Sequence, residues 1–455
     1  MLTAFLLLTL PFAFSPAAAQ DFDASTAPVR IERITFTGNR TAETILRRRL
    51  PFTEGDPLGP ASLKDARAAL WDLRQFKAVE VSSSALPGGG AAVEIAVKDG
   101  WYLIPFPFYT GGSGGGRGGL LLFSRNIFRR SESVMASVFS GDGGTSSMLF
   151  LRQEGWSLGA VFRRRSVTER EYSDGAFSAG AGFGEPPDEK DPSRYGAVAQ
   201  SYHKRTRAEA FSAAVPLARG RGGEPALSAG LGWEGSRLEY ASPAPSQPAD
   251  AGRQGQARLF LKAGREEGQG DSLGVILGFG LADLERRLAP LPTPEFAAGS
   301  EISYSRGAAW TGSDFSYGCL AARWTGSVTW GTHRSLALRL AGGHGADLPP
   351  GRLLATGRET GLSGAYAREF RGASAAGAGL TYSHPFRITR RGIWQGALFL
   401  EAARAWGSAA SGTKAGAGAS FWYRFWRFPL PLGFSCTYSF DDSDAQFSAA
   451  LGGRF

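Results

Sequence analysis

The feature that most constrains this chain is a two-residue alternation of apolar with small or polar side chains, which recurs in many segments after residue 100. Residues 156–163, 227–234, 257–264 and 335–340 show it, with apolar residues on one side and the charged residues on the other. Successive side chains in a strand point to opposite faces, so the pattern predicts β-strands with one apolar and one polar face. A water-soluble β-sandwich gives the same alternation, so the pattern alone does not place the strands in lipid.

The first residues predict export from the cytoplasm. Residues 2–14 are almost entirely apolar and are followed by Ala17, Ala18 and Ala19, the small residues of a signal-peptide cleavage site. We therefore expect residues 1–19 to be a signal peptide. After them, no window approaches the roughly 18 uncharged apolar residues that a transmembrane helix needs, which excludes helical membrane spans.

The last segment of the chain alternates up to its final residue. Phe447, Leu451 and Phe455 share its apolar face, and small residues fill the positions between them. An alternating strand that ends in Phe resembles the terminal recognition strand of bacterial outer-membrane barrels. Gly453 stands where an apolar residue is commoner in such strands.

The signal peptide, the terminal strand and the long polar connections at 186–193 and 242–255 together favour a membrane barrel over a soluble sandwich. An aromatic cluster at 101–109 marks the place where we expect the chain to enter the bilayer. Residues 100–455 are thus predicted to form a transmembrane antiparallel β-barrel. A tilted strand and its connection use about 22 residues, so the barrel should have about 16 strands.

Residues 27–99 have the pattern of a separate small α+β domain, in the order β-α-α-β-β. A Thr-Gly-Asn turn follows the first strand, and Pro51 ends the first helix because proline cannot continue it. Apolar residues at helical spacing between 63 and 73 predict the second helix, and a Pro-Gly turn at 87–90 separates the last two strands. The whole chain is therefore expected to be mainly β.

This domain resembles a POTRA (polypeptide-transport-associated) domain. The resemblance is carried by "TFTGN" at 35–39, Asp65 in the second helix, and "LRQFKAVEV" at 73–81, and it covers nearly all of residues 29–98. It implies a periplasmic domain with an exposed sheet edge, and such an edge can pair with an extended client polypeptide by β-augmentation.

A second resemblance lies in the C-terminal half. "REFRGA" at 368–373 precedes an alternating segment and then "LFLEAARAW" at 398–406. This order is similar to the BamA/TamA superfamily of outer-membrane assembly and translocation barrels, in which an Arg-Gly tip of an extracellular loop folds back into the lumen. The resemblance makes Phe370, Arg371 and Gly372 the candidate loop tip. Ala373 and Glu401 depart from the superfamily, which usually has an aromatic residue and Asp there.

An arginine inside a lumen needs an acidic partner, because an unpaired charge away from bulk water is costly. The alternation places Glu401 on the inward side of its strand, so Glu401 is predicted to pair with Arg371. In the alternative, Arg371 is an ordinary loop cation and Glu401 is a solvated lumen charge.

The two resemblances imply outer-membrane protein assembly or insertion, or polypeptide translocation. The expected partners are outer-membrane lipid, unfolded or extended client polypeptides and periplasmic accessory proteins. The alternative is a passive outer-membrane pore or a structural surface antigen, which would show a large conductance that does not depend on the small domain.

The sequence shows no motif for an enzymatic, metal-binding or nucleic-acid-binding function. The four histidines have no recognisable partner spacing and no Gly-x-Ser-x-Gly element occurs, so we expect no enzyme, catalytic residue, cofactor or metal. The net charge of +9 comes from dispersed arginines rather than a basic patch, so nucleic acid is not an expected partner. Cys319 and Cys436 match no metal-ligand spacing. We expect them to be unpaired, with a disulfide as the alternative.

Overall fold

The structure is a computed structural model. It describes residues 29–451, with longer gaps at 180–195, 220–224, 242–250, 265–290 and 426–431. The shorter gaps are residues 72, 74, 101–102, 113–114, 142, 154–155, 358–359, 363, 365, 367, 390–391 and 409–410. The predicted signal peptide and Phe455 lie outside the described residues. None of the described helices is long and apolar enough to cross a bilayer.

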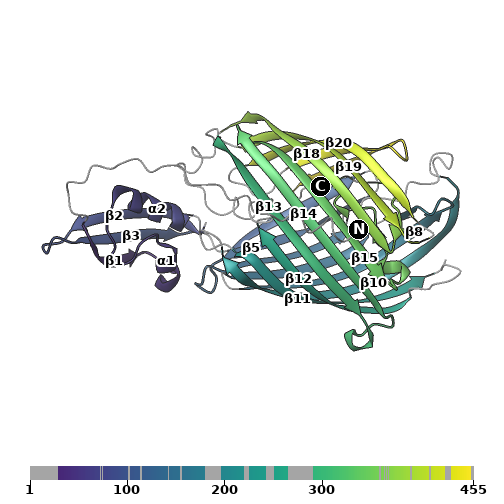
Figure 1. The fold of residues 1–455 in the computed structure, drawn as a ribbon, viewed down its shortest axis with the longest axis horizontal. Helices are drawn as coiled ribbons and strands as arrows, with labels where there is room; N and C mark the ends of the chain where they lie inside the picture. The colour runs from purple at the N-terminus through teal and green to yellow at the C-terminus, as the bar shows by residue number, and fades with distance from the viewer. Residues whose placement is uncertain are drawn as a thin grey trace, which may run out of the picture.

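The small domain stands beside one end of a large barrel (Figure 1). Its elements are β1 (Ile31–Thr37), α1 (Glu43–Arg49), α2 (Pro60–Trp71), β2 (Phe76–Ala85) and β3 (Ala91–Asp99). This is the predicted β-α-α-β-β order. The sheet order is β1-β3-β2, with β1 parallel and β2 antiparallel to the central β3. The two helices bury their apolar faces on one side of this sheet, around the fully buried Leu46, Leu70 and Ile95.

The rest of the chain forms one closed sheet. Seventeen described strands belong to it, of which the three-residue β9 pairs only with β8, so sixteen strands make the cylinder. The first eight are β4 (Leu103–Gly112), β5 (Gly115–Arg125), β6 (Ser133–Gly141), β7 (Gly144–Gln153), β8 (Trp156–Tyr172), β10 (Val198–Arg219), β11 (Pro225–Ala241) and β12 (Gly252–Gly264). The other eight are β13 (Leu291–Gly307), β14 (Tyr317–Gly331), β15 (Arg334–Ala346), β18 (Ser374–Ile388), β19 (Gly392–Trp406), β20 (Gly412–Phe425), β21 (Leu432–Ser439) and β22 (Asp444–Leu451).

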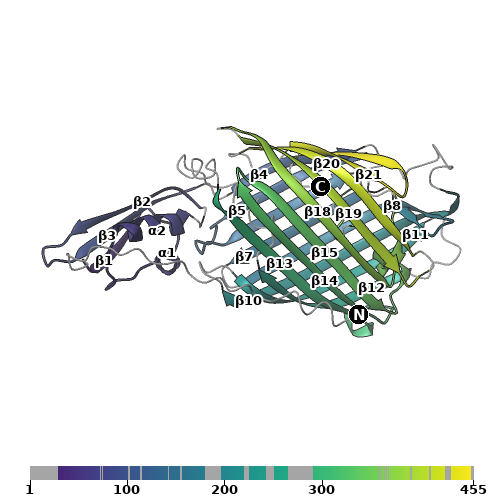
Figure 2. The ribbon, with the colours of Figure 1, turned by 45° about the horizontal axis from the view of Figure 1, so that its top comes forward.

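Each strand pairs antiparallel with its neighbour in sequence, and β22 pairs with β4 to close the ring. The strands are tilted with respect to the barrel axis (Figure 2). The prediction of about sixteen antiparallel strands is therefore confirmed. The end of the barrel where β4 begins faces the small domain, and the ends of β8, β11 and β15 lie at the opposite, far end (Figure 1).

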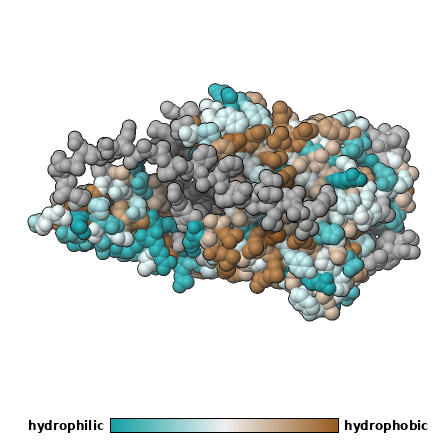
Figure 3. All heavy atoms as spheres, viewed as in Figure 1, coloured by the Kyte–Doolittle hydropathy of each residue, from teal (hydrophilic) through white to brown (hydrophobic). Residues whose placement is uncertain are grey.

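The two faces of the strands differ as the alternation predicts. Leu398 and Leu400 of β19 are 63% and 56% exposed, whereas Glu401 and Ala403 are 2% and 3% exposed. Leu259 and other large apolar side chains are likewise exposed, and on the face shown in Figure 3 apolar residues gather into a band across the barrel. Charged and small residues fill the inner face instead. A cylinder of this kind presents an apolar outside to lipid and keeps its charges inside.

The longest described excursion inside the barrel is the segment between β15 and β18, which we call the inserted loop (residues 347–373). It contains the 3-10 turn η4 (Pro350–Arg352) and two very short strands, β16 (Leu354–Ala355) and β17 (Arg371–Gly372), which pair with each other. The predicted tip residues Arg371 and Gly372 thus form β17.

Candidate functional site

The inserted loop crosses the lumen and contacts inward-facing side chains on several walls of the barrel. Its return to the wall is tight at Gly372, where an added Cβ would lie 2.3 Å from the carbonyl oxygen of Trp406 in β19. Only glycine permits this approach of two backbones. Close packing against β19 therefore explains why the second residue of the Arg-Gly tip is a glycine.

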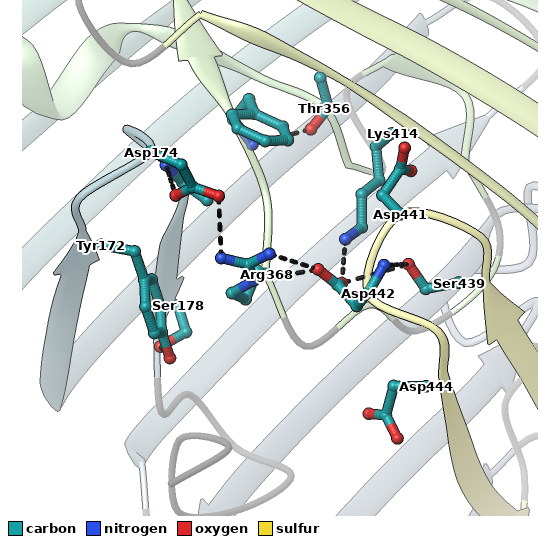
Figure 4. A network of polar contacts seen from close by, with 12 residues as sticks. Tyr172, Asp174, Ser178, Thr356, Arg368, Lys414, Ser439, Asp441, Asp442 and Asp444 are labelled. Atoms are coloured by element: carbon teal, nitrogen blue, oxygen red, sulfur yellow. Dashed lines mark hydrogen bonds and ion pairs between the residues drawn. The ribbon is translucent and has the colours of Figure 1, made fainter. Parts of the chain in front are cut away.

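Arg368 of the loop forms ion pairs with two carboxylates (Figure 4). Its Nε and Nη2 donate to Oδ1 of Asp442 at 3.0 and 2.7 Å, and its Nη1 donates to Oδ2 of Asp174 at 3.0 Å. Lys414 of β20 reaches the same carboxylate of Asp442 from the other side, and the Ser439 hydroxyl donates to it at 3.1 Å. The side chains of Lys414 and Asp442 are fully buried.

These contacts join distant parts of the barrel. Asp442 is at the turn between β21 and β22, and Asp174 follows β8, so one arginine links two walls. Burial alone would raise the pKa of Asp442. The hydrogen bonds and charges of Lys414 and Arg368 outweigh this effect and hold its pKa below the usual range.

Arg371 contacts the β8 wall. Its Nη2 is 3.3 Å from Oε1 of Glu169, and its guanidinium carbon lies 3.3 Å from the ring centre of Phe177 in β9. The segment is also held by backbone hydrogen bonds, because Glu369 and Phe177 exchange two at 2.8 Å each. Glu169 is shared with Lys204 of β10, whose Nζ is 3.4 Å away.

The predicted pairing of Arg371 with Glu401 is therefore wrong. Glu401 accepts hydrogen bonds from the backbone N–H of Gly364 at 2.7 Å and from the Tyr366 hydroxyl at 2.9 Å, and it lies 3.7 Å from Arg339 of β15. The reason for the prediction, that a charge in the lumen needs a partner, nevertheless holds, because Arg371 pairs with Glu169 and Glu401 lies near Arg339. The partners differ because the β17 segment runs along the β8–β9 wall, while the earlier part of the loop approaches β19.

A third anchor lies at η4. Arg352 donates from Nη1 to Oε1 of Glu234 in β11 at 2.9 Å and from Nε to Gln254 in β12 at 3.2 Å. The three anchors attach the inserted loop to the β8, β11–β12 and β20–β22 regions, and the contacts of Gly364 and Tyr366 with Glu401 attach it to β19. The loop therefore braces the lumen at its far end.

The sequence analysis missed Arg368 and Asp442. Arg368 stands three residues before Arg371 in the same motif, so its charge was a visible signal, but nothing local identified a partner 74 residues away. Phe370 packs beside Tyr172 and Ala176 rather than at an exposed tip. Of the predicted terminal recognition strand, Phe447 is 64% exposed on the outside of β22, Leu451 ends β22, and Phe455 is not described.

The small domain has one covered and one open sheet edge. Beside β1, Ile31 exchanges backbone hydrogen bonds with Gly55 and Asp56, and Glu54 accepts from the backbone N–H of Ile34 at 3.0 Å. That backbone hydrogen bond, aided by Arg47, lowers the pKa of Glu54. The opposite edge, β2, pairs only with β3 among the described strands. Its unpaired groups can therefore accept another strand.

A buried polar cluster fixes the small domain against the barrel. The Thr41 hydroxyl accepts hydrogen bonds from Gln75 at 2.7 Å and from Asn126, in the turn between β5 and β6, at 2.6 Å. Ser131 of the same turn donates to Gln75 at 3.0 Å, and the backbone N–H of Ala42 donates to the carbonyl of Arg129 at 3.0 Å. Thr41, Gln75 and Asn126 are at most 3% exposed.

The strands β22 and β4 close the barrel. Four residue pairs, from Ser448↔Gly112 to Leu451↔Tyr109, join β22 to β4 among the described residues, while β4 and β5 share ten. The β5–β6 turn that holds the small domain is at the end of the barrel where β4 begins, one strand away from β4. The small domain is thus placed close to the first strand of the barrel.

The described part of the chain shows neither a cluster of metal-binding side chains nor a disulfide. No group of three or more His, Cys, Asp or Glu there could hold a metal ion. Neither Cys319 nor Cys436 forms a disulfide in this part of the chain.

Comparisons with known proteins agree with this architecture. The family model POTRA, described as a surface antigen variable number repeat, matches residues 29–100. BamA from Haemophilus ducreyi lacking POTRA domains 1-3 has a TM-score of 0.55 at 15% identity, covering 93% of this chain and 84% of that one. CdiB from Escherichia coli has a TM-score of 0.60 at 11% identity, covering 93% and 76%.

CdiB from Acinetobacter baumannii gives a TM-score of 0.53 at 13% identity, covering 93% of this chain and 74% of that one. No curated protein sequence matches. At these identities the likeness between structures concerns the fold alone. It confirms the predicted combination of a BamA-like barrel with a POTRA domain.

Proposed function

We propose that this chain, a BamA-like barrel that carries a POTRA domain, inserts or translocates other polypeptides at the bacterial outer membrane. The observation that carries the proposal is the open β2 edge of the POTRA domain, which is held at the end of the barrel where β4 begins. A pore that only conducts solutes needs neither a docked domain nor an accessible strand edge. A protein that handles extended chains uses both.

The POTRA domain would capture its client by β-augmentation. Main-chain hydrogen bonds to β2 supply affinity that depends little on client sequence. Between Ser82 and Ala85 the strand is mostly exposed and carries small side chains, so a client strand meets little steric hindrance there. The covered β1 edge leaves β2 as the docking edge.

The barrel would then guide the client at the seam between β22 and β4. Pro105 and Pro107 lie two residues apart in β4, so their missing N–H groups are on the same edge of that strand. The register with β5 is unbroken from Leu103 to Gly112, so we place the missing donors on the edge of β4 that faces away from β5. The described pairs with β22 lie on this edge, from Tyr109 onward, so the missing donors lower the cost of opening the edge next to them.

Because the inserted loop ties several walls of the barrel together, we favour a client path at the seam between β22 and β4 over a path through a wide central channel. The inserted loop is attached to several walls through buried or half-buried ion pairs, and releasing it would break them. We infer that clients move beside the loop or through the seam while the loop stays attached. The POTRA domain would face the periplasm, and periplasmic accessory proteins could deliver clients to it.

Photocrosslinking to β2 tests client capture. A photoreactive amino acid at Ser83 should crosslink to unfolded outer-membrane or secreted polypeptides in cells. The same group at Arg33 on the covered β1 edge is the matched control and should give at least fivefold less product. Equal crosslinking at both positions, or none at Ser83 in a folded domain, would contradict β-augmentation.

Depletion of the protein distinguishes the two modes of handling. Loss of many barrels from the outer membrane would indicate assembly, and loss of one secreted protein would indicate a dedicated translocator. An unchanged proteome, together with a large and steady conductance in planar bilayers that survives removal of the POTRA domain, would instead establish a passive pore.

A further inference from the structure

Four arginines form a row on the outside of the barrel near its far end. In the strand register, Arg164 of β8 is opposite Arg207 of β10, which is opposite Arg237 of β11, which is opposite Arg253 of β12. All four are exposed. We call them the arginine row. Neighbouring strands lie about 4.8 Å apart, so the row spans roughly 15 Å.

The row is on the lipid side of the wall. Side chains two residues apart share a face of a strand, so Arg164 shares its face with Phe162, and Arg207 with Phe211. Both phenylalanines are 45% exposed within the outer apolar band. Their rings are 5.7 Å apart, and Trp233 stacks on Phe211 at 6.0 Å. Aromatic groups of this kind lie at the level where acyl chains meet headgroups.

The distance from the aromatic groups places the arginines among lipid headgroups. Arg164 follows Phe162 by two residues, and Arg237 follows Trp233 by four. This is about 7 to 14 Å along a tilted strand. The guanidinium groups therefore lie just beyond the apolar band, on the side away from the POTRA domain.

The row is electrostatically unfavourable without an anion. Like charges directly opposite one another on neighbouring strands destabilise a sheet. Arg237 has an ion pair with Glu239, Nε to Oε1 at 2.8 Å, and both side chains are more than half exposed. Arg164, Arg207 and Arg253 have no ion-pair partner in the described part of the chain. These three arginines thus receive no side-chain counter-charge from the described residues.

Nearby carboxylates do not neutralise the patch. Glu209 and Glu239 are the acidic residues of β10 and β11 on this face, while Arg205 adds a further arginine opposite Glu239. With Asp314, whose carboxylate accepts a hydrogen bond from the backbone N–H of Arg253 at 2.7 Å, five arginines face three carboxylates, which leaves an excess of two positive charges among the described residues. Another face of the barrel lacks such a row, because Arg404 of β19 lies between Ala376 and Thr413 in the register.

We propose that the arginine row binds the phosphate groups of a phosphorylated glycolipid in the outer leaflet. Guanidinium groups bind phosphate through paired, charge-assisted hydrogen bonds, and a row of this width can contact more than one phosphate. The proposal uses the membrane orientation of the proposed function but not its client handling. Lipid binding by the purified protein therefore tests it separately.

The test is native mass spectrometry of the full chain released from nanodiscs that contain bisphosphorylated lipid A in phosphatidylcholine. The test variant changes all four arginines of the row to Gln. A basic residue near an anionic membrane surface contributes about fivefold to binding, so allowing for non-additivity we expect the apparent affinity to fall at least about 100-fold. Replacing all four with Lys keeps the charge and should restore part of the binding, which separates loss of charge from misfolding.

The matched control changes four exposed cations of the POTRA domain to Gln, namely Arg33, Arg48, Lys64 and Lys98. It alters the net charge equally and should leave lipid A binding within about twofold. The proposal is overturned if the row variant, with a far-UV circular dichroism spectrum like that of the parent, binds lipid A as well as the parent or is no weaker than this control. It is also overturned if millimolar inorganic phosphate displaces lipid A, because the site would then bind free phosphate.

Discussion

Replacing Arg368 with Met should release the inserted loop from the lumen wall. The substitution keeps an unbranched stem about as long as the aliphatic part of arginine but removes the two hydrogen bonds to Asp442, at 2.7 and 3.0 Å, in a site where Arg368 is 8% exposed and Asp442 fully buried. A hydrogen bond to a charged group contributes about 1.5 to 3 kcal/mol. Breaking a buried ion pair costs about 3 to 5 kcal/mol. Because Asp442 keeps its contact with Lys414, we expect Arg368→Met to cost about 3 kcal/mol, the lower end of this range.

The lost contact with Asp174 adds little, because that carboxylate is 45% exposed and exposed ion pairs contribute about 0 to 1 kcal/mol. A change of about 3 kcal/mol raises the open fraction of the loop roughly 100-fold. This fraction can be measured from the rate at which a maleimide labels Thr360→Cys, a loop position that is 2% exposed, after both native cysteines are replaced with Ser.

The matched control is Arg404→Met, which removes an exposed arginine from the outside of β19. It should leave the labelling rate within about twofold. If Arg368→Met accelerates labelling less than threefold, or no more than Arg404→Met does, the loop is not held by this ion pair and the account of a braced lumen is wrong.

Three further predictions concern the other contacts. The pKa of Asp442 is lower in the folded protein than its usual 3.8, so its stabilising effect is complete above that pH and is lost as the pH falls through the folded-state value; the hydrogen exchange of residues 347–373, taken relative to the intrinsic exchange rate at each pH, should rise on acidification, and Asp442→Asn should remove part of that rise. Thr41→Val should cost about 2 kcal/mol, because it leaves the buried amide of Asn126 without its acceptor; spin labels on the POTRA domain and the barrel should show a broader distance distribution, and an unchanged one would refute a fixed junction. Arg371→Met should cost only about 1 to 2 kcal/mol, because Glu169 keeps its lysine partner; an effect on loop labelling larger than that of Arg368→Met would show that Arg371, and not Arg368, is the stronger anchor.

The sequence by itself determined the class of fold. Alternation is a local property, since successive side chains of any strand point to opposite faces, and it identified Leu398, Leu400 and Glu401 on their correct sides. Helical spacing, turn residues and proline positions likewise predicted the order of elements in the POTRA domain. These features depend on near neighbours in the chain, so they can be derived without a tertiary structure.

The partners of the buried charges were decided only by the tertiary structure. Arg368 meets Asp174 across 194 positions of sequence, and Arg371 meets Glu169 instead of Glu401. Many carboxylates face the lumen of a closed barrel, and the chain order does not say which of them the inserted loop will approach. The arginine row has the same origin, because strand register across β8, β10, β11 and β12 aligns four residues that alternation alone leaves unrelated.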